Sequence, residues 1–230
     1  MVGYKKRQNY LMYGAPDIRE DDIDEVVNTL RSGWIGSGPR VAAFEGAFLK
    51  YKEAGFASAV GSCTAGLHLS LLVAKLASGD EVITTAMTFC ATVNAIIHSG
   101  ATPVIVDIDP RTGNICPDAV IKAITPKTKA LVCVHYGGYP CEMDRLISIA
   151  KDNNLFLIED CAHAIETKFN GQPVGTFGDF GCFSFYVTKN VVTAEGGMVI
   201  GNDKTLIERI RVLALHGMSK DAWKRYSDQG

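Results

Sequence analysis

The segment from residue 178 to residue 197 contains a lysine whose surroundings could do chemistry. Residues 180–186 form an apolar run typical of a buried strand, Lys189 follows it, and a second apolar run covers residues 197–200. A charged ammonium is costly in an apolar site, whereas an uncharged lysine amine is a nucleophile that can form a Schiff base with an aldehyde. The other interpretation of the pattern is a lysine that extends from a loop into solvent.

The turn at residues 61–66 could bind an anion. It consists of small residues and lies between a predicted strand at residues 54–60 and a predicted helix at residues 67–76. Small residues let backbone N–H groups approach a phosphate, and the helix dipole adds attraction for negative charge. No Gly-Lys-Ser/Thr follows, so the turn is not a P-loop. It is either a seat for a single phosphate or a tight turn without a ligand.

Short apolar strands alternate with helices along the chain, which predicts an α/β fold with a mostly parallel sheet and helices on both faces. The predicted strands are residues 54–60, 82–85, 103–107, 130–135, 155–158, 180–186 and 197–200. The predicted helices are one that Asp17 caps and that ends at Gly33, one that begins at Pro39, and residues 67–76, 88–100, 117–124, 143–151 and 203–215.

The carboxyl ends of parallel strands are where ligands of such sheets bind. We therefore expect the polar and aromatic residues that follow the strands to converge on one edge of the sheet. These residues are Thr64, Phe89, His135, Glu159, Asp160, His163 and Lys189.

The composition limits the classes of partner. The chain has 230 residues, 47% of them hydrophobic, with a formal net charge of −2 and a pI of about 6.2. These totals predict one globular unit with a substantial core. There is no basic stripe for nucleic acid and no polybasic run for a membrane surface. No apolar segment typical of a signal peptide follows Lys5, Lys6 and Arg7.

One segment is long enough to cross a bilayer without a charged side chain. No Asp, Glu, Lys or Arg lies between Glu81 and Asp107. The segment contains Asn94, His98 and Pro103, and it divides into strand, loop, helix and strand. This pattern favours buried α/β core over a membrane span.

The seven cysteines are scattered and form no CxxC pair. This spacing indicates reduced thiols in a cytoplasmic compartment rather than a disulfide framework. Cys133 with His135, and Cys161 with His163, raise the question of zinc, but neither pair has the spacing of a zinc finger. We therefore expect no metal site.

Six motifs occur in a fixed order, and together they resemble those of the DegT/DnrJ/EryC1/StrS sugar aminotransferases. The motifs are residues 61–69 (GSCTAGLHL), 79–83 (GDEVI), 88–95 (TFCATVNA), 106–109 (VDID), 159–164 (EDCAHA) and 178–190 (GDFGCFSFYVTKN). The resemblance runs from about residue 33 to the last residue. It implies the three-layer αβα large domain of fold type I enzymes, built on a mostly parallel seven-stranded sheet, with pyridoxal 5′-phosphate (PLP) as cofactor.

The resemblance also assigns roles to individual residues. Lys189 matches the lysine that forms an imine with the cofactor aldehyde and then moves protons as a general base. Asp160 matches the carboxylate that keeps the pyridine nitrogen protonated. The remaining matches are Phe89 as the aromatic that stacks on the ring, His163 beside its phenolic oxygen, the backbone of Thr64 and Ala65 at the phosphate, and the Ser184 hydroxyl at the phosphate.

The same resemblance implies parts that this chain does not contain. We expect residues 1–32 to form an N-terminal segment with a helix, and residues 33–230 to form the PLP-binding large domain. Members of the family are longer and carry a small C-terminal domain, before which the chain looks cut. Their active sites lie between the two subunits of a homodimer, and an asparagine of the partner subunit reaches the phosphate.

The expected function is transfer of an amino group from L-glutamate to a keto group of a nucleotide-linked sugar, for amino-sugar or cell-surface polysaccharide biosynthesis. Residues 216–226 resemble members that act on the C4 keto group. Two alternatives stay open. One is a PLP-dependent sugar dehydratase of the same family, in which related proteins have histidine in place of Lys189. The other is a non-catalytic PLP-binding regulatory protein.

Overall fold

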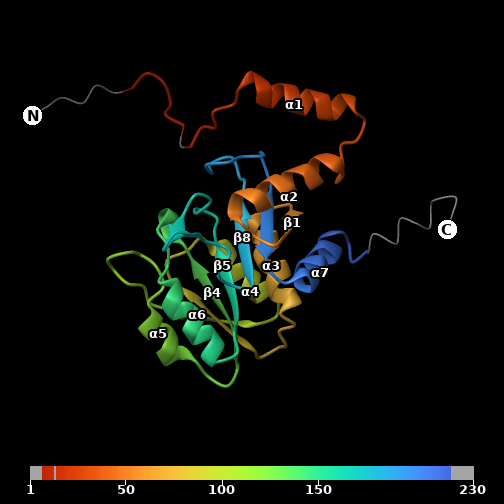
Figure 1. The fold of residues 1–230 in the computed structure, drawn as a ribbon. Helices are drawn as coiled ribbons and strands as arrows, with labels where there is room; N and C mark the ends of the chain where they lie inside the picture. The colour runs from red at the N-terminus through yellow and green to blue at the C-terminus, as the bar shows by residue number, and fades with distance from the viewer. Residues whose placement is uncertain (1–6, 13, 219–230) are drawn as a thin grey trace, which may run out of the picture.

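Seven strands form one twisted sheet in the computed structural model, which describes residues 7–12 and 14–218 (Figure 1). Their order across the sheet is β1-β9-β8-β5-β4-β2-β3. The strands are β1 (Phe56–Val60), β2 (Glu81–Thr85), β3 (Thr102–Val106), β4 (Thr128–Val134), β5 (Phe156–Asp160), β8 (Phe180–Ser184) and β9 (Gly197–Gly201). Two further short strands, β6 (Lys168–Phe169) and β7 (Gln172–Pro173), pair with each other outside this sheet.

Most neighbouring strands of the sheet are parallel. The pairs β2–β3, β2–β4, β4–β5 and β5–β8 run parallel, whereas β9 runs antiparallel to both β8 and β1. The register places Val134 of β4 and Cys182 of β8 on either side of Asp160 in β5. The prediction of a mostly parallel seven-stranded sheet is therefore confirmed.

Helices cover both faces of the sheet, as predicted (Figure 1). The helices are α1 (Glu20–Arg31), α2 (Pro39–Lys52), α3 (Cys63–Val73), α4 (Cys90–His98), α5 (Pro117–Ala123), α6 (Met143–Asp152) and α7 (Lys204–Ala214). Helices α3, α4 and α7 share one apolar cluster with the sheet, while α5 and α6 contribute to a second cluster and α2 to a third.

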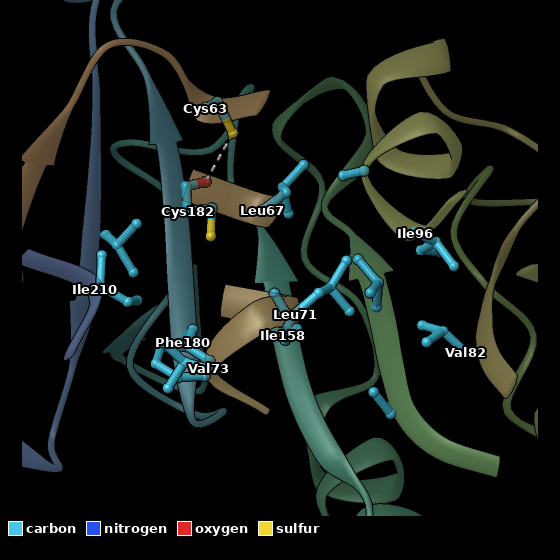
Figure 2. Packing of buried hydrophobic residues seen from close by; sticks show 14 of the residues in the cluster. Cys63, Leu67, Leu71, Val73, Val82, Ile96, Ile158, Phe180, Cys182 and Ile210 are labelled. Carbon is cyan, nitrogen blue, oxygen red and sulfur yellow. Dashed lines mark hydrogen bonds between the residues drawn. The ribbon is translucent and has the colours of Figure 1, made fainter. Parts of the chain in front are cut away.

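Successive side chains of each strand point to opposite faces of the sheet, so one sheet packs against helices on both sides. Val82 of β2 packs into the cluster with α3, and its neighbour Ile83 packs into the cluster with α6. The side chains of successive strand residues point to opposite faces, so a sheet covered on both sides needs continuous apolar runs. Figure 2 shows Leu67 and Leu71 of α3 near Ile158 in the first of these clusters. Each such leucine stabilises the fold by about 1.5–3 kcal/mol on burial.

Several predicted boundaries are wrong by a few residues, and two of the shifts change the description of the site. Strand β5 continues through Asp160, so this carboxylate belongs to the end of the strand rather than to the loop behind it. Helix α3 begins at Cys63, inside the predicted turn. Asp17 does not cap helix α1, because its carboxylate accepts hydrogen bonds from the Arg19 side chain and the helix begins at Glu20.

Helix α1 stands apart from the sheet in Figure 1 and has no buried residue. The charge-free segment between Glu81 and Asp107 is β2, α4 and β3, as the pattern favoured. Among residues 7–12 and 14–218, none of the helices combines the length and the apolar character needed to span a bilayer. Most of the motif at residues 216–226, from residue 219 onward, lies outside the residues that the structure describes.

Candidate active site

Asp160 is a buried carboxylate that receives hydrogen bonds from neutral groups. Its Oδ2 accepts from the Thr92 hydroxyl at 2.8 Å, and its Oδ1 accepts from the Ala162 N–H at 3.1 Å. The Cys63 thiol lies 3.8 Å from Oδ1 and 3.4 Å from the carbonyl oxygen of Cys182, the contact drawn in Figure 2. Across residues 7–12 and 14–218, Asp160 takes part in no ion pair. The Asp160 carboxylate thus has no cation within salt-bridge distance among these residues.

The Cys63 thiol keeps its proton in this environment. Burial raises the pKa of Cys63 well above its ordinary value, and the Asp160 carboxylate raises it further, while the Lys189 ammonium acts in the opposite direction. A protonated thiol has a hydrogen that it can donate to the Asp160 carboxylate or to the Cys182 carbonyl. The contacts of this thiol with Asp160 of β5 and with the Cys182 carbonyl of β8 bring the ends of the two strands together at the start of α3.

Lys189 and His163 lie on the same edge. Lys189 is half-buried in the turn after β8, where its backbone N–H donates to the Tyr186 carbonyl at 2.8 Å. Desolvation lowers the pKa of His163, the Lys189 ammonium lowers it further, and the Asp160 carboxylate opposes both. The Nδ1 of His163 accepts from the Gly137 N–H at 3.4 Å, which places the ring beside the turn that follows β4.

The N-terminus of α3 forms the anion-seeking corner of the site. The Ser62 hydroxyl caps the helix by accepting from the Ala65 N–H at 3.1 Å, so this N–H, which was expected at a phosphate, already has a partner. The Thr64 N–H has no hydrogen-bond acceptor in the described part of the chain. A free N–H in the first turn of a helix, together with the helix dipole, attracts an anion.

Ser184 is brought to this corner by the glycine opposite to it. Ser184, the last residue of β8, pairs with Gly197 of β9. A Cβ on Gly197 would lie 2.5 Å from the Ser62 carbonyl carbon and 2.6 Å from the Cys63 nitrogen. Only glycine lets β9 approach the first turn of α3 so closely. The Ser184 hydroxyl and the Thr64 N–H therefore belong to one corner.

Phe89 is an exposed aromatic in the connection between β2 and α4. It occupies the N-cap position of α4, where no side chain caps the helix, and 73% of its surface is exposed. An N-cap favours a small polar residue, so an exposed phenylalanine there gives up a stabilising contact. Local rules of this kind are broken mainly at functional sites.

Glu159 and His135 do not join the site, in contrast to the expectation from their positions at strand ends. Glu159 points to the other face of β5 and accepts backbone hydrogen bonds from Gly175, Phe177 and Gly178 at 2.7–2.8 Å. Its fourth partner is the Nε2 of His135 at 3.1 Å, and His135 Nδ1 accepts from the Cys141 N–H. Both side chains are completely buried.

The same cluster contains three residue types that can ligate a metal ion. The ligand atoms of His135, Glu159 and Cys161 lie within 4.8 Å of one another. Every oxygen of Glu159 and both nitrogens of His135 already take part in hydrogen bonds within the protein. Binding an ion here would break these bonds in the core, so the cluster serves as an anchor for the loop at residues 174–178.

The remaining groups fit a ligand with four distinct parts. A buried carboxylate without a cation suits a protonated ring nitrogen, and an exposed aromatic suits the face of that ring. The helix N-terminus and the Ser184 hydroxyl suit a phosphate, and a lysine amine suits an aldehyde. PLP carries all four parts. Asp160, Phe89, Thr64, Ser184 and Lys189 would hold it.

Comparison with known proteins gives the same indication. The family model described as the DegT/DnrJ/EryC1/StrS aminotransferase family matches residues 16–230. The chain is 50% identical to the spore coat polysaccharide biosynthesis protein SpsC of Bacillus subtilis over 98% of its own length and 58% of that protein. It is 43% identical to the GDP-perosamine synthase of Escherichia coli O157:H7 over 87% of its own length and 55% of that protein.

A solved structure supports the fold at similar coverage. The PLP form of the putative sugar aminotransferase Spr1654 from Streptococcus pneumoniae superposes with a TM-score of 0.86 at 37% sequence identity. The match covers 91% of this chain and 59% of that protein. The chain therefore spans little more than half the length of the relatives that it matches.

Proposed function

Because this chain belongs to the DegT/DnrJ/EryC1/StrS aminotransferase family, we propose that the protein carrying it is a PLP-dependent aminotransferase that acts on nucleotide-linked sugars. The amino donor is L-glutamate, and the acceptor is a keto group at C4 of the sugar. The names of two relatives, a GDP-perosamine synthase and a spore coat polysaccharide biosynthesis protein, support this substrate class and a place in polysaccharide biosynthesis.

The observation that carries the proposal is the meeting of three elements at one edge of the sheet. The Cys63 thiol at the start of α3 lies 3.8 Å from Oδ1 of Asp160 in β5 and 3.4 Å from the carbonyl oxygen of Cys182 in β8, and Lys189 lies in the turn that follows β8. This arrangement supports a site in which a lysine amine, a buried carboxylate and a helix N-terminus act on one phosphorylated aldehyde.

Lys189 has two roles in this reaction. Its amine would hold the cofactor aldehyde until the amino donor displaces it. The released amine would then take the proton from the α-carbon of the donor and pass it to the aldehyde carbon that the amine had held. The cofactor, when bound, would supply an electron sink for this proton transfer. In the second half of the reaction Lys189 would take a proton back from that carbon and deliver it to the sugar carbon that receives the amine.

The other residues would orient the cofactor and stabilise its charged groups. The Asp160 carboxylate stabilises a protonated ring nitrogen, because an opposite charge within reach favours the charged form. Phe89 would cover one face of the ring and exclude water from it. His163 would contact the phenolic oxygen. The Thr64 N–H and the Ser184 hydroxyl would bind the phosphate, and the dipole of α3 would add to their attraction.

The proposed assembly is a homodimer in which each subunit helps to complete the active site of the other. The chain covers 58% of SpsC, and the remaining length of such a protein offers the small domain and the partner contacts that the family resemblance implies. The choice of sugar substrate is therefore proposed for the full-length protein and not for this chain alone. No nucleic acid or membrane partner is part of the proposal.

The decisive experiment uses the natural protein that carries this chain. PLP is added, and the absorption spectrum is recorded before and after L-glutamate. The sample without glutamate is then reduced with borohydride, and the modified peptide is identified by mass spectrometry. We expect a yellow protein that bleaches with glutamate and a label on Lys189. A Lys189→Ala variant serves as the control and should remain unlabelled. A label on another lysine, or no bleaching, would contradict the proposal.

Asp160 provides a separate prediction. Asp160→Asn keeps the shape of the side chain and removes its charge, so it should lower kcat of the amino transfer by about a hundredfold or more. The melting temperature should change little, because the amide oxygen of asparagine can accept from the Ala162 N–H while its NH2 group donates to the Thr92 hydroxyl, which can act as donor or acceptor. The measurement is kcat beside a thermal melt. Normal turnover in this variant would remove Asp160 from the proposed mechanism.

A further inference from the structure

Two threonine hydroxyls form a chain that ends on Asp160. The Thr88 Oγ1 lies 2.7 Å from the Thr92 Oγ1, and the Thr92 Oγ1 lies 2.8 Å from the Asp160 Oδ2. Thr92 and Asp160 are buried, with 1% and 5% of their surfaces exposed, while Thr88 is half-buried. These two hydrogen bonds therefore lead from the edge of the sheet, next to Phe89, to the carboxylate.

The direction of these hydrogen bonds follows from the groups involved. An ionised carboxylate only accepts, so the single hydroxyl hydrogen of Thr92 points to Asp160. The oxygen of Thr92 is then free to accept, and Thr88 is the donor. Hydrogen bonds of this kind polarise one another, so the donor to Asp160 is strengthened by the one behind it.

The two oxygens of Asp160 differ in their surroundings. Oδ1 accepts from the Ala162 N–H and lies beside the Cys63 thiol, whereas Oδ2 accepts from Thr92 alone among the residues that the structure describes. A carboxylate oxygen can accept two hydrogen bonds. Oδ2 therefore has an acceptor position left, and the Thr92 hydroxyl determines where that position points.

Thr92 also belongs to the same helical turn as the exposed aromatic. The Thr92 N–H donates to the Phe89 carbonyl at 3.1 Å in the first turn of α4. The backbone of α4 thus links the position of Phe89 to the hydroxyl that holds Asp160. One helix end supports both groups that the proposed function places against the cofactor ring.

We propose that Thr92, supported by Thr88, is a positioning residue that holds Oδ2 of Asp160 toward the ring nitrogen of the cofactor. This inference rests on the proposed function, in which Asp160 faces that nitrogen. Thr92 itself touches Asp160 and not the ring. Its removal should weaken recognition of the ring nitrogen and leave recognition of the aldehyde and the phosphate unchanged.

The test measures binding rather than turnover. The natural full-length protein is titrated with PLP and with its deaza analogue, in which carbon replaces the ring nitrogen. Both ligands have the same aldehyde and phosphate, so the ratio of their Kd values reports the nitrogen contact alone. We expect the unmodified protein to prefer PLP by about tenfold or more, as a charge-assisted hydrogen bond allows. Thr92→Val should reduce this preference about fivefold.

Three variants complete the design. Thr92→Ser restores the hydroxyl and should restore the preference for PLP. Thr84→Val is the matched control, since Thr84 is an equally buried threonine whose hydroxyl donates to the Val132 carbonyl at 3.0 Å, away from Asp160. It should leave the preference unchanged. Thr88→Val changes a half-buried position and should cause a smaller loss in the same direction, which decides the question if Thr92→Val does not fold.

The outcomes separate this inference from the proposed function. If Thr92→Val weakens both ligands equally, or weakens neither, Thr92 does not position Asp160 and the inference is overturned. If a competition experiment shows that the unmodified protein binds PLP no more tightly than it binds inorganic phosphate, the proposed function itself fails. A selective loss for PLP, rescued by Thr92→Ser, supports both.

Discussion

Glu159 and Asp160 are adjacent carboxylates in one strand, and their positions on opposite faces of β5 give them opposite roles. Glu159 accepts three backbone hydrogen bonds and one from His135, which ties the loop at residues 174–178 to the sheet. Asp160 accepts from neutral donors and retains acceptor capacity. The alternation of strand side chains therefore separates an anchor from a candidate catalytic group within two residues.

The pKa of His163 depends on the charges of Lys189 and Asp160, so a titration of His163 can detect both side chains. Its pKa lies below the ordinary value of 6.5 because of desolvation and the Lys189 ammonium, while Asp160 opposes this shift. In the cofactor-free protein, the NMR titration of the His163 ring should therefore have its midpoint below 6.5. Lys189→Gln should raise the midpoint, since it removes a positive charge. Asp160→Asn should lower it, since it removes a negative charge.

The resonance of His163 is identified by its loss in His163→Gln. If Lys189→Gln and Asp160→Asn shifted the midpoint in the same direction, or not at all, the three side chains would not share one electrostatic environment. The active-site geometry described above would then be wrong at this edge of the sheet.

Most of the candidate site could be predicted from strand ends and motif order, but its internal contacts could not. Lys189, Asp160 and His163 were expected at one edge, and their mutual influence is consistent with that. The hydrogen bond from Thr92 to Asp160 joins residues that are far apart in sequence. Thr88 lies just before α4 and Thr92 lies in its first turn, and this four-residue spacing across the start of the helix is the signal that could have suggested their pairing.

At the scale of the elements, the corner between β9 and α3 depends on the absence of one side chain. A Cβ on Gly197 would overlap the peptide between Ser62 and Cys63, which is backbone and cannot rotate away. Gly197→Ala should therefore push the first turn of α3 away from β9, with a loss of stability of about 1–3 kcal/mol. Since the Thr64 N–H moves with that turn, the Kd for PLP should rise more than tenfold.

The matched control for this prediction lies in the same turn. Gly61 has open space around the position of its Cβ, so Gly61→Ala should change neither stability nor PLP affinity appreciably. Calorimetric unfolding and PLP titration of both variants provide the comparison. Equal behaviour of the two variants would show that the close approach at Gly197 is not needed.

The elements themselves were predictable, and their ends were less so. All seven strands of the main sheet and all seven α-helices occur within a few residues of where the sequence predicted them. The strands and helices α2 to α7 bury an apolar stripe or face, whereas α1 has no buried residue. Strand β5 extends through Asp160 because the backbone of this residue pairs with β4 and β8, and such pairing overrides the polarity of a carboxylate. Asp17 failed as a cap because Arg19 engages its carboxylate first.

At the scale of the whole molecule, one buried cation connects a helix to the segment behind the site. Lys52, in the last turn of α2, donates to the Ile165 carbonyl at 2.9 Å and lies 4.9 Å above the ring of Phe183. Only 1% of its surface is exposed. Burial lowers the pKa of Lys52 below 10.5, although nearby acidic groups oppose the shift.

The lowered pKa of Lys52 determines the sign of a pH effect on stability. Between the folded-state pKa and 10.5, the unfolded chain holds the proton and the native protein does not, so stability rises with pH in this window. The unfolding free energy of the unmodified protein minus that of Lys52→Met should be flat near neutral pH and should increase as the pH approaches 10.5. Urea unfolding from about pH 7 to about pH 11 measures this difference.

The exposed Lys50 in the same helix supplies the control. Subtracting Lys50→Met in the same way should give no such increase, since this side chain keeps its solvent in the folded state. A flat difference for Lys52→Met would contradict the lowered pKa, and a difference that decreases with pH would reverse its sign.

The order of the strands is the part of the fold that residue patterns could not predict. Strand β9 lies between β1 and β8 and is antiparallel to both, whereas its short apolar sequence would suit any interior position. Pairing between strands depends on contacts across the whole chain rather than on local periodicity. The family resemblance supplied the number of strands, and the structure supplied their arrangement.

This arrangement imposes an order of events on the newly made protein. Strand β1 has β9 as its neighbour in the sheet, and Val60 pairs with Gly197, roughly 140 residues later in synthesis. At ribosomal speed, β1 therefore waits on the order of ten to thirty seconds for its partner. Nascent chains that are stalled before β9 emerges should be cut readily by protease around β1, and chains stalled well beyond it should resist. Until then the apolar strand is a natural binding site for chaperones.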